Sequence, residues 1–215
     1  MREIDKLGIG SLFIVSIISF FMGAVIAIQL AAQIDSPLIP MYTVGYGTRE
    51  SVILEFSPTV MALILAGKVG SNISSEIGTM RVSEQIDALE IMGINSANYL
   101  VLPKIIAALF INPILTIISM ILGIYGGYLA CTSTGLLDAS TFIYGATMSF
   151  NPFHFIYALV KSFVFAFVIT SIAAYRGYYV QGGSEEVGHA STKAVVNSSI
   201  SILVWNFILT RIMLL

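Results

Sequence analysis

The sequence predicts an all-α integral membrane protein with five transmembrane helices per subunit and a short cytoplasmic helix between the second and third. Hydrophobic residues make up 57% of the chain and charged residues only 10%, whereas a soluble domain carries about 25% charged residues. Uncharged stretches recur at lengths that match the roughly 20 apolar residues a helix needs to cross a bilayer. We therefore expect residues 1–215 to form a single transmembrane domain.

Three of the spans contain little or no charge. Leu7 to Ile34 carries no charged residue, which predicts a first span over 8–34. A cleaved signal peptide is the alternative, but its apolar core would be only about 7–15 residues long. The third span is expected over 99–130, with a kink at Asn112-Pro113, and the fifth over 194–212.

The second and fourth spans each require an ionisable residue within the bilayer or at its edge. A second span over 51–74 includes Glu55, and a fourth over 153–175 includes Lys161. An uncharged alternative to the fourth span, over 139–160, is interrupted by an Asn-Pro pair and is polar in its first half. We therefore expect five spans.

Lysine and arginine residues fall mostly on one side of this topology. If the N-terminus is inside, only Arg49 and Arg211 lie outside. The inner set is Arg2, Lys6, Lys68, Arg81, Lys104, Arg176 and Lys193. Because short cytoplasmic loops are enriched in these residues, we predict a cytoplasmic N-terminus, a cytoplasmic loop after the second span and an outer C-terminus.

A charged helix interrupts the apolar sequence between the second and third spans. Six of the 22 charged residues fall between Lys68 and Glu90. We expect a helix over about 79–93, with Ser83 as its N-cap and Gly93 as its C-terminal stop. Its apolar side chains are expected to share one face: Val82, Ile86, Leu89 and Met92.

Three roles fit such a helix. A helix lying on lipid headgroups would display lysine and arginine, whereas this one is acidic. It could also be a solvated connection between two spans. We favour the third role, insertion into a groove on a cytoplasmic ATPase. The residues assigned to this ATPase coupling are Arg81, Glu84, Gln85, Asp87, Leu89, Glu90, Met92 and Gly93.

Glu55 and Lys161 are the ionisable residues that this topology leaves within the bilayer. A charge there costs about 2.5–3.5 kcal/mol on insertion scales, so each should face a partner or a wet cavity. Both spans enter from the outer side, and the two residues differ in depth by about one helical turn. We expect them to approach each other or to line one substrate pathway, with Lys161 placed to meet a lipid phosphate. A purely structural ion pair is the alternative.

Small residues recur every four positions in several spans. The stripes are Ser19-Gly23-Ala27-Ala31, Ala62-Ala66-Gly70-Ser74-Gly78 and Ala158-Ser162-Ala166-Thr170-Ala174, and Gly123 and Gly127 form a GxxxG pair. Such residues let helix backbones approach closely in lipid. We expect them to pack within one subunit, and a dimer interface is the alternative for some of these faces.

Several functional classes find no support in the sequence. The net charge of −2 argues against a nucleic-acid partner. Cys131 is the only cysteine, so neither a disulfide within the chain nor a CxxC site can form. We expect His154 to form hydrogen bonds at the outer interface and His189 to be a solvated polar residue, so no metal site is predicted. Without a Walker A or GxGxxG pattern, the chain is expected to be non-catalytic and to bind no cofactor.

Several motifs together resemble the MlaE (YrbE) family of ABC-transporter permeases, and they cover essentially the whole chain in order. They are Glu55-Phe56-Ser57-Pro58, Gly67-Lys68-Val69-Gly70, Glu76–Asn95, Leu102-Pro103-Lys104, Val160–Val164 and Gly188–Ser199. The chain departs from the family at Leu54 and Ser57, where an Arg-Glu-x-Gly-Pro motif is usual, and at Lys68, which replaces an arginine. Family members also carry an interfacial helix before the first span, where this sequence has residues 1–6.

The resemblance implies a homodimeric permease in the inner membrane of a diderm bacterium, with its C-terminus in the periplasm. It implies a dimer of a cytoplasmic ABC ATPase, which would hold ATP and Mg²⁺, and a periplasmic MCE-domain lipid-binding protein. The substrate would be phospholipid moved between inner and outer membranes, which contributes to outer-membrane lipid asymmetry.

Other functions remain as alternatives. A secondary transporter driven by ion gradients would need more intramembrane charges and an inverted repeat. An enzyme acting on lipids would need a carboxylate pair, a Ser/His pair or a metal cluster, and Glu55 with Lys161 is none of these. An ABC permease for another hydrophobic solute is the nearest rival, although the gap from Gly93 to Leu102-Pro103 is too short for the loop motif of solute importers.

Overall fold

The structure is a computed structural model that describes residues 8, 10–34 and 39–215. No strand occurs in that part of the chain, which confirms the predicted all-α class. Among the described residues, five helices are long and apolar enough to cross a membrane: Gly10–Gln33, Tyr42–Val82, Ser96–Ser133, Pro152–Tyr178 and Ser184–Leu214. The second is longer at both ends than the expected 51–74, so Arg49 and Glu50 belong to the same continuous helix as Glu55. An interfacial helix over 1–6 would lie outside the described residues.

The chain divides into two compact units, and four of the five long helices contribute residues to both of them. The first, here the α6 unit, contains the described residues 8, 10 and 11, together with 62–113 and 161–215. The second, here the α8 unit, contains 12–61 and 114–160. Each unit is described by itself.

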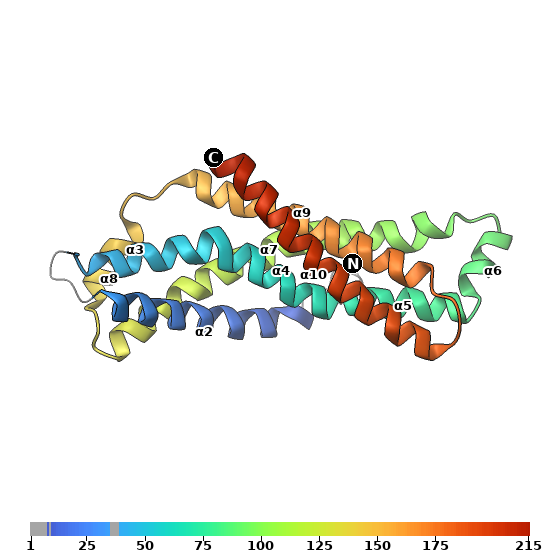
Figure 1. The fold of residues 1–215 in the computed structure, drawn as a ribbon, viewed down its shortest axis with the longest axis horizontal. Coiled ribbons are helices and arrows are strands. Elements are labelled where there is room, and N and C mark those ends of the chain that lie inside the picture. The colour runs from blue at the N-terminus through green and yellow to red at the C-terminus, as the bar shows by residue number, and fades with distance from the viewer. Residues whose placement is uncertain (1–7, 9, 35–38) are drawn as a thin grey trace. The chain divides into compact units, whose positions relative to one another are not determined.

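The α8 unit is built from closely packed helices. Its elements are α2 (Gly10–Gln33), α3 (Tyr42–Ser51), η2 (Val52–Val60), α8 (Ala139–Thr147) and the adjoining parts of α7 (Ser96–Ser133) and α9 (Pro152–Tyr178). A core of small and aromatic side chains, including Ala27 and Phe142, holds α2, α3, α7 and α8 together. A Cβ on Gly23 would overlap the carbonyl of Gly123, so the small residues of α2 and α7 serve packing within the subunit. Helix α8 lies against α3 (Figure 1).

The second span contains π-helical turns. Element η2 includes Pro58, which has no backbone N–H and whose ring clashes with the carbonyl four residues earlier in an α-helix. A wider turn relieves that clash, which explains why the helix changes type here without ending. Glu55 lies in this π-helical segment.

Ser57, at which the sequence departs from the motif that it resembles, belongs to a buried serine network. Its Oγ accepts a hydrogen bond from Ser119 Oγ at 3.1 Å, and Ser19 Oγ donates to Ser119 Oγ at 2.9 Å. The three hydroxyls join the second span to α7 and α2. The hydroxyl of Ser57 is therefore accommodated by polar partners on neighbouring helices.

Arg49 fastens α3 to the chain that follows α8. Its side chain is 3% exposed, and its Nη1 donates to the carbonyls of Ala146 at 2.9 Å and Met148 at 2.8 Å. Its Nη2 lies 2.5 Å from Glu50 Oε1, and Glu50 Oε2 lies 2.6 Å from His154 Nδ1. The last carbonyls of α8 thus bind a cation, which also complements the negative end of the helix dipole.

The α6 unit carries the helix between the second and third spans. Its elements are α4 (Met61–Leu65, from Ala62), η3 (Ala66–Gly70), α5 (Ser71–Val82), α6 (Gln85–Ile91), α10 (Ser184–Leu214) and the adjoining parts of α7 and α9. Helix α10 packs against α5 (Figure 1). A Cβ on Gly177 of α9 would approach the Ser74 carbonyl to 2.6 Å. The stripe from Ala62 to Gly78 is buried throughout, so it packs inside the chain.

Candidate coupling site

Helix α6 begins at a tight turn whose geometry differs from the prediction. Ser83 was the expected N-cap, but its Oγ bonds back to the Thr79 carbonyl at 2.7 Å, at the end of α5. Glu84 is the N-cap instead, because its carbonyl accepts the first bond of α6, from Ala88 N at 3.0 Å. Its φ of 60° is left-handed, a conformation that costs an L-residue about 1–2 kcal/mol. The single helix expected over 79–93 is thus divided between α5 and α6.

The C-terminus of α6 ends as predicted at Gly93. This glycine has φ +76°, its N–H donates to the Glu90 carbonyl at 3.0 Å, and Ile94 N donates to the Leu89 carbonyl at 3.0 Å. This pair of bonds is a Schellman motif, which satisfies the last carbonyls of the helix. The end of α6 is therefore well defined.

Glu90 ties α6 to two longer helices. Its Oε1 accepts hydrogen bonds from Ser96 Oγ and from Tyr178 OH, both at 2.9 Å. The hydrogen bonds from Ser96 and Tyr178 favour the ionised form and lower the pKa of Glu90 below its ordinary 4.5. Ser96 begins α7 and Tyr178 ends α9. Glu90 therefore attaches α6 to the first residue of α7 and to the last residue of α9.

Two further ion pairs brace this end of the α6 unit. Arg81 Nη1 lies 2.6 Å from Asp87 Oδ1, which joins α5 to α6 across the turn. Lys104 Nζ lies 2.8 Å from Glu76 Oε2, which joins α7 to α5. Lys104 is 5% exposed, so it is anchored between the two helices. Arg81 and Asp87 are thus engaged inside the chain.

The apolar face of α6 is only partly as predicted. Ile86 is fully buried and Leu89 is half-buried, so both hold α6 against the rest of the unit. Val82 ends α5 and is exposed at 36%, and Met92 is exposed at 65%. The turn at Glu84 breaks the continuous helix that would have aligned the four. Within α6 the most exposed apolar residue is Ile91, at 87%, which the predicted face did not include.

A polar groove runs beside α6. It has a volume of about 690 Å³, and its lining comes mainly from α5, including Glu76 and Thr79, with Gln85 from α6. Gln85 also donates from Nε2 to Ser83 Oγ at 3.0 Å. Exposed apolar side chains therefore lie at one end of α6 and a polar recess at the other.

The intramembrane charges lie in different units. Glu55 is half-buried in the α8 unit, and its Oε2 accepts a hydrogen bond from Thr59 Oγ1 at 2.8 Å. Lys161 is fully buried in the α6 unit. Their approach to each other remains a prediction.

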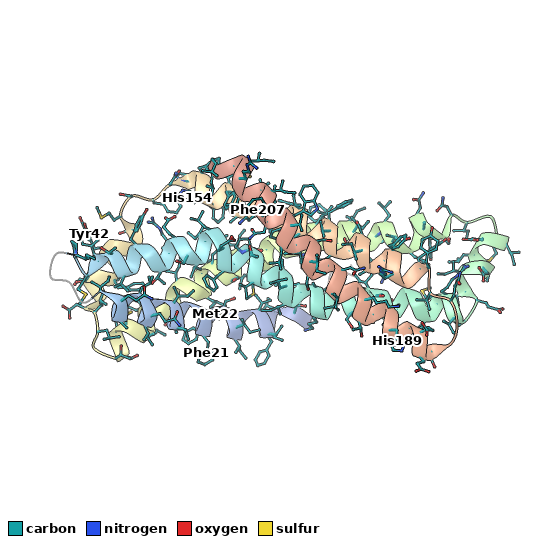
Figure 2. All side chains as sticks on the ribbon, in the orientation of Figure 1. Phe21, Met22, Tyr42, His154, His189 and Phe207 are labelled. Atoms are coloured by element: carbon teal, nitrogen blue, oxygen red, sulfur yellow. The ribbon has the colours of Figure 1, made fainter. Side chains whose placement is uncertain are left out.

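Figure 2 places the two histidines on separate helices. His154 lies at the start of α9 and contacts Glu50 and Asn151, with Nε2 3.4 Å from Asn151 Nδ2. His189 lies on α10 and is 60% exposed, 3.9 Å from Glu185. Glu185 lies one helical turn from His189 in the sequence, whereas Glu50 is too distant from His154 along the chain to be assigned as its partner.

The sequence did not identify the residues that anchor α6. Tyr178 is separated from Glu90 by two helices, and Ser96 lies beyond the loop that follows α6. The adjacent apolar pair Ile91-Met92 immediately before Gly93 was the one local signal of an exposed tip.

The chain matches a family model described as Permease MlaE over residues 1–212. It is 40% identical over 212 residues to a probable ABC transporter permease protein of Rickettsia bellii, covering 99% of this chain and 82% of that protein. It is 34% identical over 219 residues to a probable ABC transporter permease protein of Synechocystis, covering 99% of this chain and 81% of that protein. It is 31% identical over 216 residues to the intermembrane phospholipid transport system permease protein MlaE of Haemophilus influenzae, covering 99% of this chain and 82% of that protein.

Proposed function

The chain belongs to the MlaE family of ABC-transporter permeases, and from this we propose that it carries phospholipids between the inner and outer membranes. That transport would contribute to outer-membrane lipid asymmetry. The chain supplies the membrane path, and a dimer of a separate cytoplasmic ATPase supplies ATP hydrolysis with Mg²⁺. The name of the Haemophilus influenzae relative, which assigns intermembrane phospholipid transport to that protein, supports the substrate class.

The proposed assembly contains two copies of this chain, the ATPase dimer and a periplasmic MCE-domain lipid-binding protein. The N-terminus lies in the cytoplasm and the C-terminus in the periplasm, since lysine and arginine favour cytoplasmic loops. Helix α6 then faces the cytoplasm, where the ATPase is.

The tip of α6 is the observation that carries the coupling role. Ile91 and Met92 expose 87% and 65% of their surface, next to a helix end fixed by the Schellman motif and by the Glu90 hydrogen bonds. Large apolar side chains held in a fixed position in water favour contact with a soluble partner. Ser96 and Tyr178 connect that contact to α7 and α9.

Replacing the tip residues tests this role. Ile91→Ser with Met92→Ser should weaken ATPase binding by at least tenfold, because buried anchors of an interface each contribute about 2 kcal/mol. The control is Ile212→Ser on α10, whose side chain is similarly exposed, at 72%. Binding is measured by titrating purified ATPase onto the permease in nanodiscs. Equal binding by the double variant and the control would contradict the coupling role.

Reconstitution tests the substrate and the energy source. Proteoliposomes containing the complete complex should transfer labelled phospholipid to acceptor vesicles only with hydrolysable ATP. Transfer that follows an ion gradient without ATP would instead support a secondary transporter. Transfer of another hydrophobic solute and not of phospholipid would support the rival permease.

Glu55 and Lys161 are proposed to line the substrate pathway. Exchanging the charges, with Glu55→Lys and Lys161→Glu, separates a pathway role from a structural pair. A functional role predicts a folded complex that no longer transports lipid, whereas a structural pair predicts restored transport. Normal transport by both Glu55→Ala and Lys161→Ala would contradict the proposal.

A further inference from the structure

A long groove lies between α9 and α10 within the α6 unit. Its apolar section has a volume of about 630 Å³ and is lined by aromatic and aliphatic side chains such as Phe163, Phe167 and Trp205. A second section of about 570 Å³ shares Ser171, Ile172 and Ser201 with the first, so the two are continuous. Arg176 lines the second section and also a third one, of about 240 Å³.

The groove follows one face of each helix. On α9 its lining residues recur every three or four positions from Phe163 to Arg176, which spans about 20 Å at 1.5 Å per residue. On α10 they recur similarly from Trp205 back to Lys193. A bilayer measures about 40–45 Å with its headgroup regions, so the groove has the depth of one leaflet.

Polarity changes steadily along the groove. Leu109, Phe163 and Trp205 line one end, the hydroxyls of Ser171 and Ser201 lie at the middle, and Arg176 lies beyond them. Lys193 lines the last section with Arg176, together with the carboxylate of Glu186. The order is apolar, weakly polar and cationic, which matches the acyl chains, ester groups and phosphate of a glycerophospholipid.

The guanidinium of Arg176 is held in place by a neutral group. In the amide orientation that gives both side chains partners, Asn197 Oδ1 accepts from Arg176 Nε at 3.0 Å and from Nη2 at 2.5 Å. An amide oxygen orients the guanidinium without neutralising its charge. An oriented arginine of this kind is suited to a phosphate oxygen.

Tyrosines mark the depth of the cationic end. Tyr175 and Tyr179 are 60% and 65% exposed, and their rings lie 4.9 Å apart. Tyrosine is enriched at the level of lipid headgroups. Tyr178 bonds to Glu90 of α6, so the cationic end of the groove and α6 lie at the same end of this unit.

We propose that the groove between α9 and α10 binds one glycerophospholipid, with its phosphate at Arg176 and Lys193 and its acyl chains along Phe163, Phe167 and Trp205. The role as an entry site rests on the proposed function. Since α6 is assigned to the cytoplasm, this lipid belongs to the cytoplasmic leaflet. Phospholipid would therefore enter the transporter beside α6, the helix that we propose contacts the ATPase.

Trp205 is the only tryptophan in the chain, so its fluorescence reports directly on the groove. The full-length permease in detergent is titrated with phosphatidylglycerol that carries brominated acyl chains, which quench a tryptophan on contact. We expect saturable quenching by one lipid per subunit. Arg176→Gln with Lys193→Gln should weaken this binding about tenfold or more, since hydrogen bonds to charged groups contribute about 1.5–3 kcal/mol.

Control ligands and variants separate this site from other sources of quenching. Brominated diacylglycerol lacks the phosphate, so its weaker binding should be the same in wild type and the double variant. Soluble glycerophosphate should not compete. Arg211→Gln removes a cation from the same helix outside the groove and should bind as wild type does. Ser201→Phe should block the groove and abolish lipid binding. Val196→Phe adds the same bulk to α10 outside the groove and should bind lipid normally. Both purified variants should remain monodisperse.

Three results would overturn the inference. Non-saturable quenching that is equal in all variants would indicate bulk lipid, and full competition by glycerophosphate would indicate a site for free phosphate. No quenching by any brominated lipid would indicate that a second copy covers the groove.

The transport assay distinguishes this inference from the proposed function. Wild-type transport that is unchanged by Arg176→Gln with Lys193→Gln would refute the entry site and leave the function standing. Saturable binding in a wild-type complex that fails to move phospholipid would refute the function and leave the lipid site standing.

Discussion

Removing the guanidinium of Arg49 should destabilise the α8 unit strongly. Arg49→Met retains most of the length and apolar volume of the side chain, but it leaves the carbonyls of Ala146 and Met148 and the carboxylate of Glu50 without this donor. Arg49 is 2% exposed, so water cannot replace it at these oxygens. Breaking a buried charged cluster by removing one partner costs about 3–5 kcal/mol.

That loss converts into a measurable change of melting temperature. For a chain of this size about 2–4 °C is lost per kcal/mol, so Arg49→Met should melt about 6–20 °C below wild type. Arg49→Lys should be intermediate, because an ammonium group keeps the charge but cannot reproduce the planar fork that contacts two carbonyls and a carboxylate. Adding Glu50→Gln to Arg49→Met should recover part of the loss, because it removes the carboxylate left without its cation.

Thermal unfolding in detergent, followed by fluorescence-detected size exclusion, measures these changes. Arg211→Gln, an exposed cation on α10, is the control and should shift the midpoint by no more than about 2 °C. A midpoint for Arg49→Met within that range would refute the assignment of Arg49 as the clamp of α8. An Arg49→Lys variant that is as unstable as Arg49→Met would also refute this assignment, because the positive charge would then contribute nothing to stability.

Three further changes test other parts of the structure. Glu84→Gly should raise the melting temperature by relieving about 1 kcal/mol of left-handed strain, and Glu84→Val should lower it; the reverse order would refute that turn. Gly23→Leu should disrupt the contact of α2 with Gly123 of α7, at a cost above the usual 1–3 kcal/mol of overpacking; Gly67→Leu, beside which there is open space, is the control. Because the folded-state pKa of Glu90 is depressed, its stabilising contribution is complete above pH 4.5 and is lost as the pH falls through the lower folded value. Hydrogen exchange of α6 should therefore accelerate in that acidic range in wild type, and a Glu90→Gln variant that shows the same acid response would contradict this.

The spans and the family followed from local sequence features. Predominantly apolar stretches predicted five membrane helices, and the motifs predicted the MlaE family, both of which are confirmed. The Asn151-Pro152 pair predicted a break, and α9 begins there, with Asn151 Oδ1 accepting a bond from Phe153 N at 3.0 Å. These predictions succeeded because length, polarity and proline geometry act within a few residues.

The coupling helix was predicted less completely. Gly93 ended it as expected, because a left-handed C-terminal residue is a local requirement that favours glycine. The start was misplaced, because Glu84 adopts a left-handed φ that an L-residue's identity does not signal. Once that turn divided the helix, the periodicity that joined Val82 to Met92 no longer described one face.

By itself the sequence determined that this is a membrane protein, how many helices can cross the membrane, and to which family the chain belongs. It could do so because the length of apolar stretches and contiguous motifs are properties of the chain alone. The tertiary structure decided which groups meet. The Arg49 clamp, the Glu90 anchor and the graded groove from Trp205 to Arg176 each join side chains from separate helices. Such contacts depend on how helices turn and approach one another, so only packing in three dimensions could select them.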